Sequence, residues 1–217
     1  TDFTNAGNGE VFGPVNLEPA LTVSSDVYFD TVGDRFWHVW KQGDRTRGLG
    51  IQSKARELGF GVGSGFELDE AQGRVPDPAW KAAFSQANYK TKAARDANSI
   101  WYPFDDIFPA VGQGDLVVTP LQLANAYAAF ANDGTLWRPH IRKKVVDADG
   151  HATKDVAKPI RRVNLDPTTR AAMLAGLVGA VAQPKGTAYA AFQGFPLGQV
   201  PIAGKTGTAQ VQGKGDT

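Results

Sequence analysis

Two stretches with the same opening constrain the fold of this chain most. Residues 119–134 read TPLQLANAYAAFANDG, and residues 166–182 read DPTTRAAMLAGLVGAVA. Each begins with a residue favoured at helix N-caps, then a proline suited to the first turn, then apolar residues at helical spacing. Between them, residues 141–163 contain the turn sequence DADG and predict a β-hairpin. The chain is therefore expected to mix α and β structure.

The first of these helices also predicts part of the core. Its apolar residues form one stripe, and such a stripe faces the protein interior more often than a cofactor. The stripe consists of Leu121, Ala124, Tyr127, Ala128 and Ala131. Gly134 is expected just after the helix, at the C′ position that favours glycine.

The N-terminal part of the chain predicts further helices. Residues 1–15 are rich in Gly and Asn and predict a loop. Asn16 is a candidate N-cap of a short helix, and Ser24 or Ser25 is a candidate N-cap of the next one. Residues 46–58 predict a weaker helix.

Composition excludes several classes of function. The 217 residues include 23 basic and 22 acidic ones without a basic stripe, which argues against nucleic acid as a partner. No apolar run approaches the roughly 20 residues of a membrane span, so this piece is expected to be soluble. There is no cysteine, and the three histidines, His38, His140 and His151, lack the spacing of metal ligands. We therefore expect no metal site.

Two short clusters contain residues suited to chemistry. KTGT at 205–208 is predicted on a strand, where Lys205 could hold an anion or lower the pKa of a nearby hydroxyl. SSDVYF at 24–29 places Ser24 and Asp26 at a predicted helix N-terminus. Taken alone, the first could be a polar strand end and the second an ordinary N-cap. Together, 181 positions apart, they form a candidate site.

These clusters resemble the second and third motifs of class B penicillin-binding proteins, and the Asp at position 26 resembles the penicillin-binding protein 2 type. Two other stretches are similar to that subgroup: the loop FGVGSGFELDEAQGRVPDPAWK at 60–81 and VGQGDLVVTPLQLANAYAAFANDGT at 111–135. The family's first motif, S-x-x-K, is absent from this sequence, because none of its serines has a lysine three residues later. The resemblance implies that the nucleophilic serine lies before Thr1 and that further strands follow residue 217.

The resemblance also implies a fold. Residues 1–217 would belong to a transpeptidase domain of the penicillin-binding protein and serine β-lactamase type, incomplete at both ends. Such a domain has an antiparallel sheet flanked by helices and a helical subdomain. Residues 16–135 would belong mostly to the helical subdomain, and residues 136–217 mostly to the part associated with the sheet.

Roles for individual residues follow from the same resemblance. Ser24 would relay a proton, and Asp26 would orient the missing lysine or the substrate amide, whereas Ser25 is expected to be structural. Lys205 would pair with the substrate carboxylate or polarise Ser24. Further substrate contacts would come from Thr206, Gly207 and Thr208. Neither a metal nor an organic cofactor would be needed.

The implied activity is that of a peptidoglycan D,D-transpeptidase. It would cross-link stem peptides ending in D-Ala-D-Ala through an acyl-enzyme and would react with β-lactam antibiotics. The implied setting is an extracytoplasmic domain anchored by a membrane helix, working with a membrane glycosyltransferase in an elongation complex. Three alternatives remain open: a D,D-carboxypeptidase or β-lactamase, a β-lactam sensor, and a non-catalytic scaffold. The isolated fragment is expected to be inactive.

Overall fold

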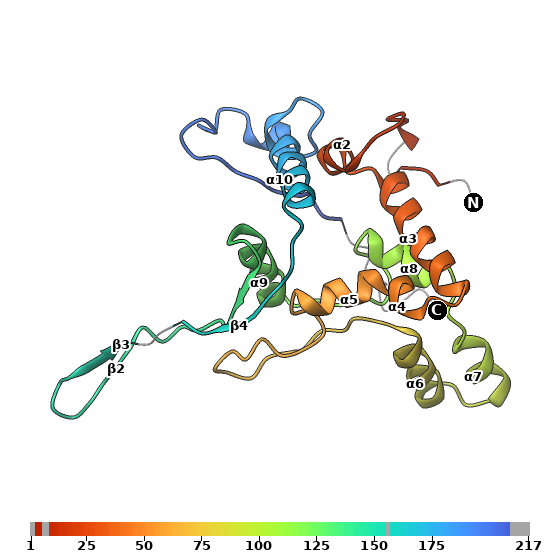
Figure 1. Ribbon diagram of the computed structural model, residues 1–217, viewed down its shortest axis with the longest axis horizontal. Helices are drawn as coiled ribbons and strands as arrows, with labels where there is room; N and C mark the ends of the chain where they lie inside the picture. The colour runs from red at the N-terminus through yellow and green to blue at the C-terminus, as the bar shows by residue number, and fades with distance from the viewer. Residues whose placement is uncertain (1–2, 6–8, 155–156, 209–217) are drawn as a thin grey trace. The chain divides into compact units, whose positions relative to one another are not determined.

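The computed structural model describes residues 3–5, 9–154 and 157–208 and contains both helices and small antiparallel sheets (Figure 1). The helices are α2 (Leu17–Val23), α3 (Asp26–Lys41), α4 (Arg45–Gly48), α5 (Gly50–Glu57), α6 (Pro78–Asn88), α7 (Lys92–Asn98), α8 (Phe104–Ala110), α9 (Pro120–Ala131), α10 (Pro167–Ala182) and the 3₁₀-helix η1 (Tyr189–Phe192). The mixed α and β fold expected from the sequence is confirmed.

The chain forms two compact units, and each unit is built from segments that are separated along the sequence. Residues 1–51, 101–114 and 166–217 make up the first unit, and residues 52–100 and 115–165 make up the second. The candidate site residues 24–26 and 205–208 belong to the first unit. The division into a helical part and a sheet-associated part at residue 135 stays a prediction.

The predicted helix starts are present. The Thr119 hydroxyl accepts the Gln122 N–H while the Gln122 side chain accepts the Thr119 N–H, which forms a capping box at the start of α9. Asp166 caps α10 through the Thr169 N–H. The short helix α2 begins after Asn16 as predicted, although the Asn16 side chain makes no capping bond.

Two details of α9 differ from the prediction. The left-handed residue after the C-cap is Asp133 (φ 61°), so Gly134 (φ 94°) follows one position later than expected. The predicted core stripe is also wrong: Leu121 is half-buried, and its other members, Ala124, Tyr127, Ala128 and Ala131, are exposed. The residues buried along this helix are Gln122, Ala126 and Ala129.

The orientation of α9 follows from the bonds of Gln122. Its side-chain N–H groups donate to the carbonyls of Val62 and Gln72, each at 2.7 Å. Only 2% of Gln122 is exposed, and a buried amide is stable when such bonds satisfy it. The large apolar side chains Leu123 and Tyr127 of the same helix stay 44% and 43% exposed, so apolar area alone does not select the buried face, and the bonds of Gln122 match the face that is buried.

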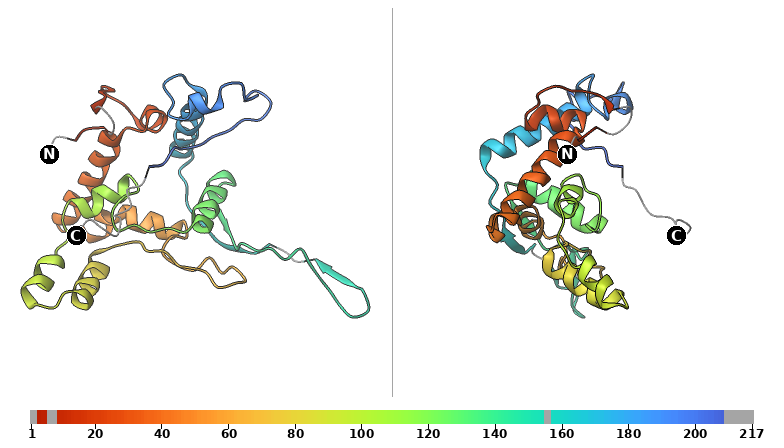
Figure 2. Two further views of the ribbon diagram at one scale, coloured as in Figure 1. Left: turned by 180° about the vertical axis from the view of Figure 1, so that it is seen from behind. Right: turned by 90° about the vertical axis from the view of Figure 1, so that its right-hand side faces the viewer.

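Helices α2 and α10 pack together at a backbone distance that requires glycine, and the two views of Figure 2 show them side by side. A Cβ added to Gly176 would lie 2.6 Å from the Glu18 carbonyl oxygen. The buried Thr22 hydroxyl contacts the Gly176 carbonyl oxygen at 3.2 Å. This contact fixes the end of α2, from which Ser24 extends.

Helix α3 packs on α8 in the same unit. Gly33 is buried, and a Cβ added there would lie 2.7 Å from the Ile107 Cα. The buried Asp106 carboxylate accepts the Trp101 indole N–H at 2.9 Å. Helix α8, from whose end the Gln113 loop extends, is therefore packed on the helix that begins at Asp26.

The strands form two antiparallel pairs. β1 (Thr135–Trp137) pairs with β4 (Pro159–Arg162), and β2 (Lys144–Val146) pairs with β3 (Ala152–Lys154). The predicted DADG turn joins β2 and β3, where the Asp147 N–H donates to the His151 carbonyl at 3.0 Å. The predicted hairpin is confirmed.

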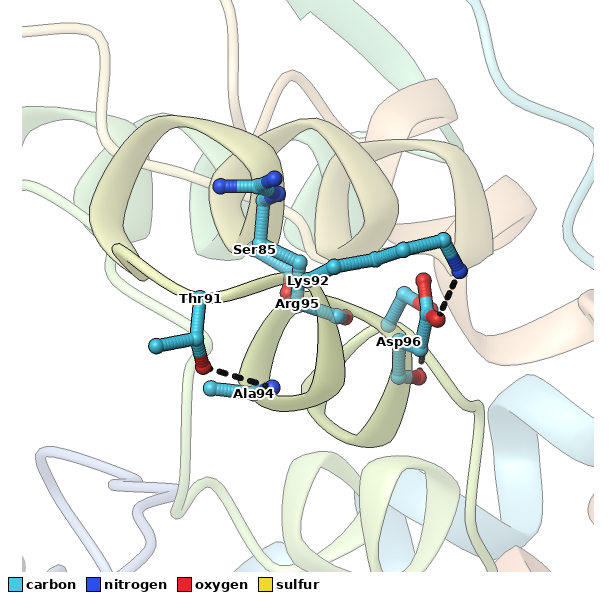
Figure 3. A network of polar contacts seen from close by, with 7 residues as sticks. Ser85, Thr91, Lys92, Ala94, Arg95 and Asp96 are labelled. Carbon is cyan, nitrogen blue, oxygen red and sulfur yellow. Dashed lines mark hydrogen bonds and ion pairs between the residues drawn. The ribbon is translucent and has the colours of Figure 1, made fainter.

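Helices α6 and α7 in the second unit are joined by polar contacts (Figure 3). The buried Ser85 hydroxyl donates to the Arg95 carbonyl at 2.6 Å, and the Thr91 hydroxyl caps α7 by accepting the Ala94 N–H.

Among the described residues, no helix combines the length and the apolar character that crossing a bilayer requires.

Candidate active site

Ser24 links the helices α2 and α3 in a left-handed backbone conformation, with φ 57° and ψ 53°. Such a conformation is unfavourable for residues other than glycine, and it occurs often at functional sites. Here it ends α2 and lets α3 begin two residues later, at Asp26. The Ser24 side chain is therefore held at a junction between two helices.

Ser25, and not Ser24, is the N-cap of α3. Its hydroxyl accepts the Tyr28 N–H at 3.3 Å and donates to the Asn5 side-chain oxygen at 3.1 Å. Only 2% of Ser25 is exposed. Its capping bond and burial agree with the expectation that Ser25 is structural, and they leave the Ser24 hydroxyl available for other contacts.

Lys205 meets Ser24 across 181 positions of sequence. The Lys205 Nζ donates to the Ser24 Oγ at 2.7 Å and to the Thr206 carbonyl oxygen at 2.9 Å. An ammonium group has three N–H donors, so one remains beyond these two bonds. Burial lowers the pKa of Lys205 below its ordinary value of 10.5, and the nearby negative charge of Asp26 opposes part of that shift.

The segment around Lys205 differs from the prediction in its backbone. Residues 199–208 form no strand within the described part of the chain, and residues 209–217 lie outside it. A strand requires a ladder of backbone bonds to a neighbour. The bond made here by the backbone N–H of Gly204 goes instead to the Leu177 carbonyl of α10, at 3.1 Å.

Two residues that the sequence did not single out hold this segment. The Thr206 and Thr187 hydroxyls lie 2.8 Å apart, and the Gln113 side-chain N–H donates to the Thr208 carbonyl at 3.0 Å. Gly207 is exposed, and a Cβ added there would meet nothing within 4 Å. Gln113 stands in the GQG stretch, which offered a signal, whereas no pattern pointed to Thr187.

Asp30 lies one helical turn after Asp26 on α3. Burial, followed by repulsion from the Asp26 carboxylate, raises the pKa of Asp30 to about 6 from its ordinary value of 3.8. Asp26 therefore affects two groups in opposite ways: it favours the charged form of Lys205 and disfavours the charged form of Asp30.

The raised pKa of Asp30 predicts a pH-dependent stability. Between pH 3.8 and about 6 the folded state keeps a proton that the unfolded state has lost, so stability falls as the pH rises through this window. Replacing Asp30 by asparagine should stabilise the protein at pH 7.5 by about 1 kcal/mol after solvent screening, or about 2–4 °C in Tm. At pH 3.5 the gain should vanish.

Thermal unfolding of the two proteins at both pH values measures this difference. Asp34→Asn is the matched control on the next turn of α3, because the Asp34 carboxylate lies 3.3 Å from the His38 ring nitrogen and no gain is expected. An Asp30→Asn variant that is no more stable than the wild type at pH 7.5 would contradict the prediction.

Among the described residues, one group has the composition of a metal site: Asp147, Asp149 and His151, all exposed in the β2–β3 turn. One Asp147 carboxylate oxygen accepts the backbone N–H groups of Asp149 and His151, at 3.0 and 2.8 Å. These bonds show the carboxylate closing the turn. The expectation of no metal stays a prediction.

Comparison with known proteins identifies relatives along the whole chain. A family model described as the penicillin binding protein transpeptidase domain matches residues 1–217. The peptidoglycan D,D-transpeptidase MrdA of Acinetobacter baumannii is 30% identical over 206 residues, which cover 92% of this chain and 26% of that protein.

Solved structures agree with this match. PBP2 of Helicobacter pylori, in its complex with MreC, is similar with a TM-score of 0.63 and 28% identity, over 91% of this chain and 31% of that one. A chain of a peptidoglycan synthase complex gives a TM-score of 0.65 and 27% identity, over 95% of this chain and 30% of that one. The chain thus spans less than a third of the length of these relatives.

Proposed function

The chain belongs to the penicillin binding protein transpeptidase domain family, and from this premise we propose that it is part of a peptidoglycan D,D-transpeptidase. The reaction transfers the acyl group of one stem peptide, with loss of its terminal D-Ala, to an enzyme serine. An amine of a second stem peptide then takes the acyl group and completes the cross-link. The relatives named D,D-transpeptidase support this activity.

The proposal gives each site residue a role. The nucleophile is a serine that residues 1–217 do not contain, since no S-x-x-K occurs among them. Ser24 relays the proton to the leaving amine, and Lys205 polarises Ser24 and attracts the substrate carboxylate. Asp26 orients the lysine of the missing motif or the substrate amide, and its negative charge favours the charged form of Lys205. The substrate backbone and carboxylate contact Thr206, Gly207 and Thr208.

The 2.7 Å contact between the Lys205 Nζ and the Ser24 Oγ carries this proposal. It joins the two clusters whose chemistry is complementary, and it lies at a residue with an unfavourable backbone conformation. A lysine that only covered apolar surface would extend its ammonium into water instead. The burial that lowers the pKa of Lys205 is consistent with a site built for proton transfer.

The partners and location are part of the proposal. The MreC complex and the peptidoglycan synthase complex among the structural relatives support a place for the full-length protein in an elongation complex with a membrane glycosyltransferase. Its substrate carries a D-Ala-D-Ala terminus, and β-lactams react at the same serine. The domain lies outside the cytoplasmic membrane, to which the full-length protein is anchored.

Product analysis tests the activity. The full-length protein, incubated with a stem-peptide donor and an amine acceptor, should yield the cross-linked peptide and free D-Ala by mass spectrometry. Hydrolysed donor without cross-link would indicate a D,D-carboxypeptidase. A stable adduct that does not turn over would indicate a sensor, and the absence of any adduct would indicate a scaffold.

The missing S-x-x-K gives a direct prediction for the 217-residue chain. Incubated alone with a fluorescent penicillin, it should form no covalent adduct, because it has no activated serine of that motif. Intact mass and fluorescence on a denaturing gel measure this, with the full-length protein as the positive control. A stoichiometric adduct on the short chain would mean that the nucleophile had been misplaced.

A further inference from the structure

Gln113 occupies a loop whose backbone is held in place. It lies between Gly112 (φ 77°) and Gly114 (φ 74°), whose left-handed backbone conformations are ones that glycine adopts without strain. Its own N–H donates to the Phe108 carbonyl of α8 at 2.8 Å. The backbone of the loop is therefore fixed on α8, and the Gln113 side chain extends from it to the Thr208 carbonyl at 3.0 Å.

We propose that Gln113 is a positioning residue of the active site, whose side-chain amide holds the Thr208 backbone in the geometry that acylation requires. The inference rests on the proposed function, in which the segment around Thr208 contacts the substrate backbone and carboxylate. We add that the Thr208 N–H stabilises the oxyanion formed during acylation. Gln113 touches neither substrate nor reacting atoms in this scheme. It acts through Thr208.

Three contacts at alternate positions hold the segment. Gly204 bonds to α10, Thr206 contacts Thr187, and Thr208 accepts from Gln113. Without the bond from Gln113 to Thr208, the two remaining contacts hold Gly204 and Thr206 but not Thr208. Because only two backbone torsions separate the N–H and carbonyl of one residue, a bond that fixes the Thr208 carbonyl also limits where its N–H points.

The contact suits positioning better than general stability. It lies at the surface, and Thr208 is exposed, so the bond adds little to the folding free energy. A carbonyl oxygen has two lone pairs, so Thr208 can accept an amide N–H of the substrate while Gln113 remains bound. Small displacements of a positioned donor, by contrast, lower the rate of the chemical step strongly.

Two variants of the full-length protein test the proposal. Gln113→Met keeps the length of the side chain and removes the N–H donor. Gln113→Glu keeps the shape, but its carboxylate cannot donate; when protonated, it regains one O–H donor. At pH 7.5 both variants should lower the limiting rate of acylation by a fluorescent penicillin about 10-fold, the upper range for one hydrogen bond. The half-saturating concentration should change less than about 2-fold, since Lys205 is intact.

The pH profile separates positioning from a structural defect. Relative to the wild type at the same pH, Gln113→Glu should recover most of its rate near pH 4, and Gln113→Met should not. Because this recovery is a change between two pH values in the ratio of the variant rate to the wild-type rate, and Gln113→Met should not show it, a general folding defect does not imitate it. Gln193→Met is the matched control, since the Gln193 side chain also donates an exposed hydrogen bond to a backbone carbonyl, that of Tyr189, at 3.3 Å. The acylation rate of this variant should equal that of the wild type.

Four outcomes would overturn the inference, provided that the wild type is acylated. They are an unchanged limiting rate in the Gln113 variants, faster acylation of Gln113→Met, an equal loss in Gln193→Met, and no recovery of Gln113→Glu at low pH. Faster acylation would mean that Gln113 blocks the Thr208 carbonyl. A full-length wild-type protein that is not acylated at all contradicts the proposed function, and the inference with it.

Discussion

Replacing Ser24 by alanine in the full-length protein should slow acylation by about 10²-fold or more, the scale of one positioned proton-transfer group. The Ser24 hydroxyl is the acceptor for the Lys205 Nζ at 2.7 Å, and alanine removes it without adding volume. Folding should change little, because alanine removes no buried capping bond here. Stopped-flow fluorescence with a labelled penicillin, at saturating and subsaturating concentrations, measures the limiting rate and the affinity separately.

Ser25→Ala is the matched control, one residue away with the same chemistry. It should leave the acylation rate within a few fold of the wild type and lower the stability by about 1–2 kcal/mol, because it removes the cap of α3. The two variants should thus separate activity from stability. Equal effects on the rate, or a larger effect at Ser25, would show that the proton-relay role has been assigned to the wrong serine.

The choice between these serines shows where sequence reasoning ends. Both are good N-caps, and the pattern SSD allows either to start the helix. The left-handed backbone of Ser24 decides the matter, because it closes α2 and shifts the cap to Ser25. That conformation accompanies a backbone bond from the Ser25 N–H to the Ala20 carbonyl at 2.9 Å, and the side-chain pattern SSD does not specify this bond.

Local features of the fold were predictable for a physical reason. Caps and turns depend on a few neighbouring residues, so Thr119, Asp166 and the DADG turn fulfil their predicted roles. The buried face of α9 was not predictable, because Leu123 and Tyr127 stay exposed while Gln122 is buried by bonds to a loop that is distant in sequence. The expected strand at KTGT failed similarly, since a strand depends on a partner elsewhere in the chain.

The candidate site was predictable only in part. Residues 24–26 and 205–208 were paired through their resemblance to a family, since a separation of 181 positions gives no local signal. Thr187 could not be predicted because its contact is a hydroxyl pair between two loops. The roles of the site residues remain predictions, and the variants of Ser24 and Lys205 test two of them.

Lys205→Ala in the full-length protein should lower acylation by about 10- to 150-fold. A hydrogen bond to a charged group contributes about 1.5–3 kcal/mol net, and tenfold corresponds to about 1.4 kcal/mol. Lys205→Arg should recover only part of this loss, because the wider guanidinium cannot replace a compact ammonium between Ser24 and the Thr206 carbonyl. The same stopped-flow assay measures both variants.

The protein should remain folded without Lys205. Because burial lowers the pKa of Lys205 in the folded state, the unfolded chain binds more protons between that pKa and 10.5, and stability rises with pH there. Below this window the charged ammonium opposes folding, and alanine removes that cost. Thermal unfolding at pH 7.5 should therefore show a Tm no lower than about 2 °C below the wild type. A larger fall would show that the loss of activity reflects unfolding.

A double-mutant cycle decides what Lys205 holds during the reaction. Two of its three N–H groups meet Ser24 and the Thr206 carbonyl, which leaves one for a substrate carboxylate. A substrate analogue with that carboxylate amidated should react about 10- to 150-fold more slowly with the wild type but only slightly more slowly with Lys205→Ala, since two changes that remove one interaction do not add. If the two penalties add in full, the carboxylate contacts other groups, and Lys205 acts on acylation through Ser24 alone.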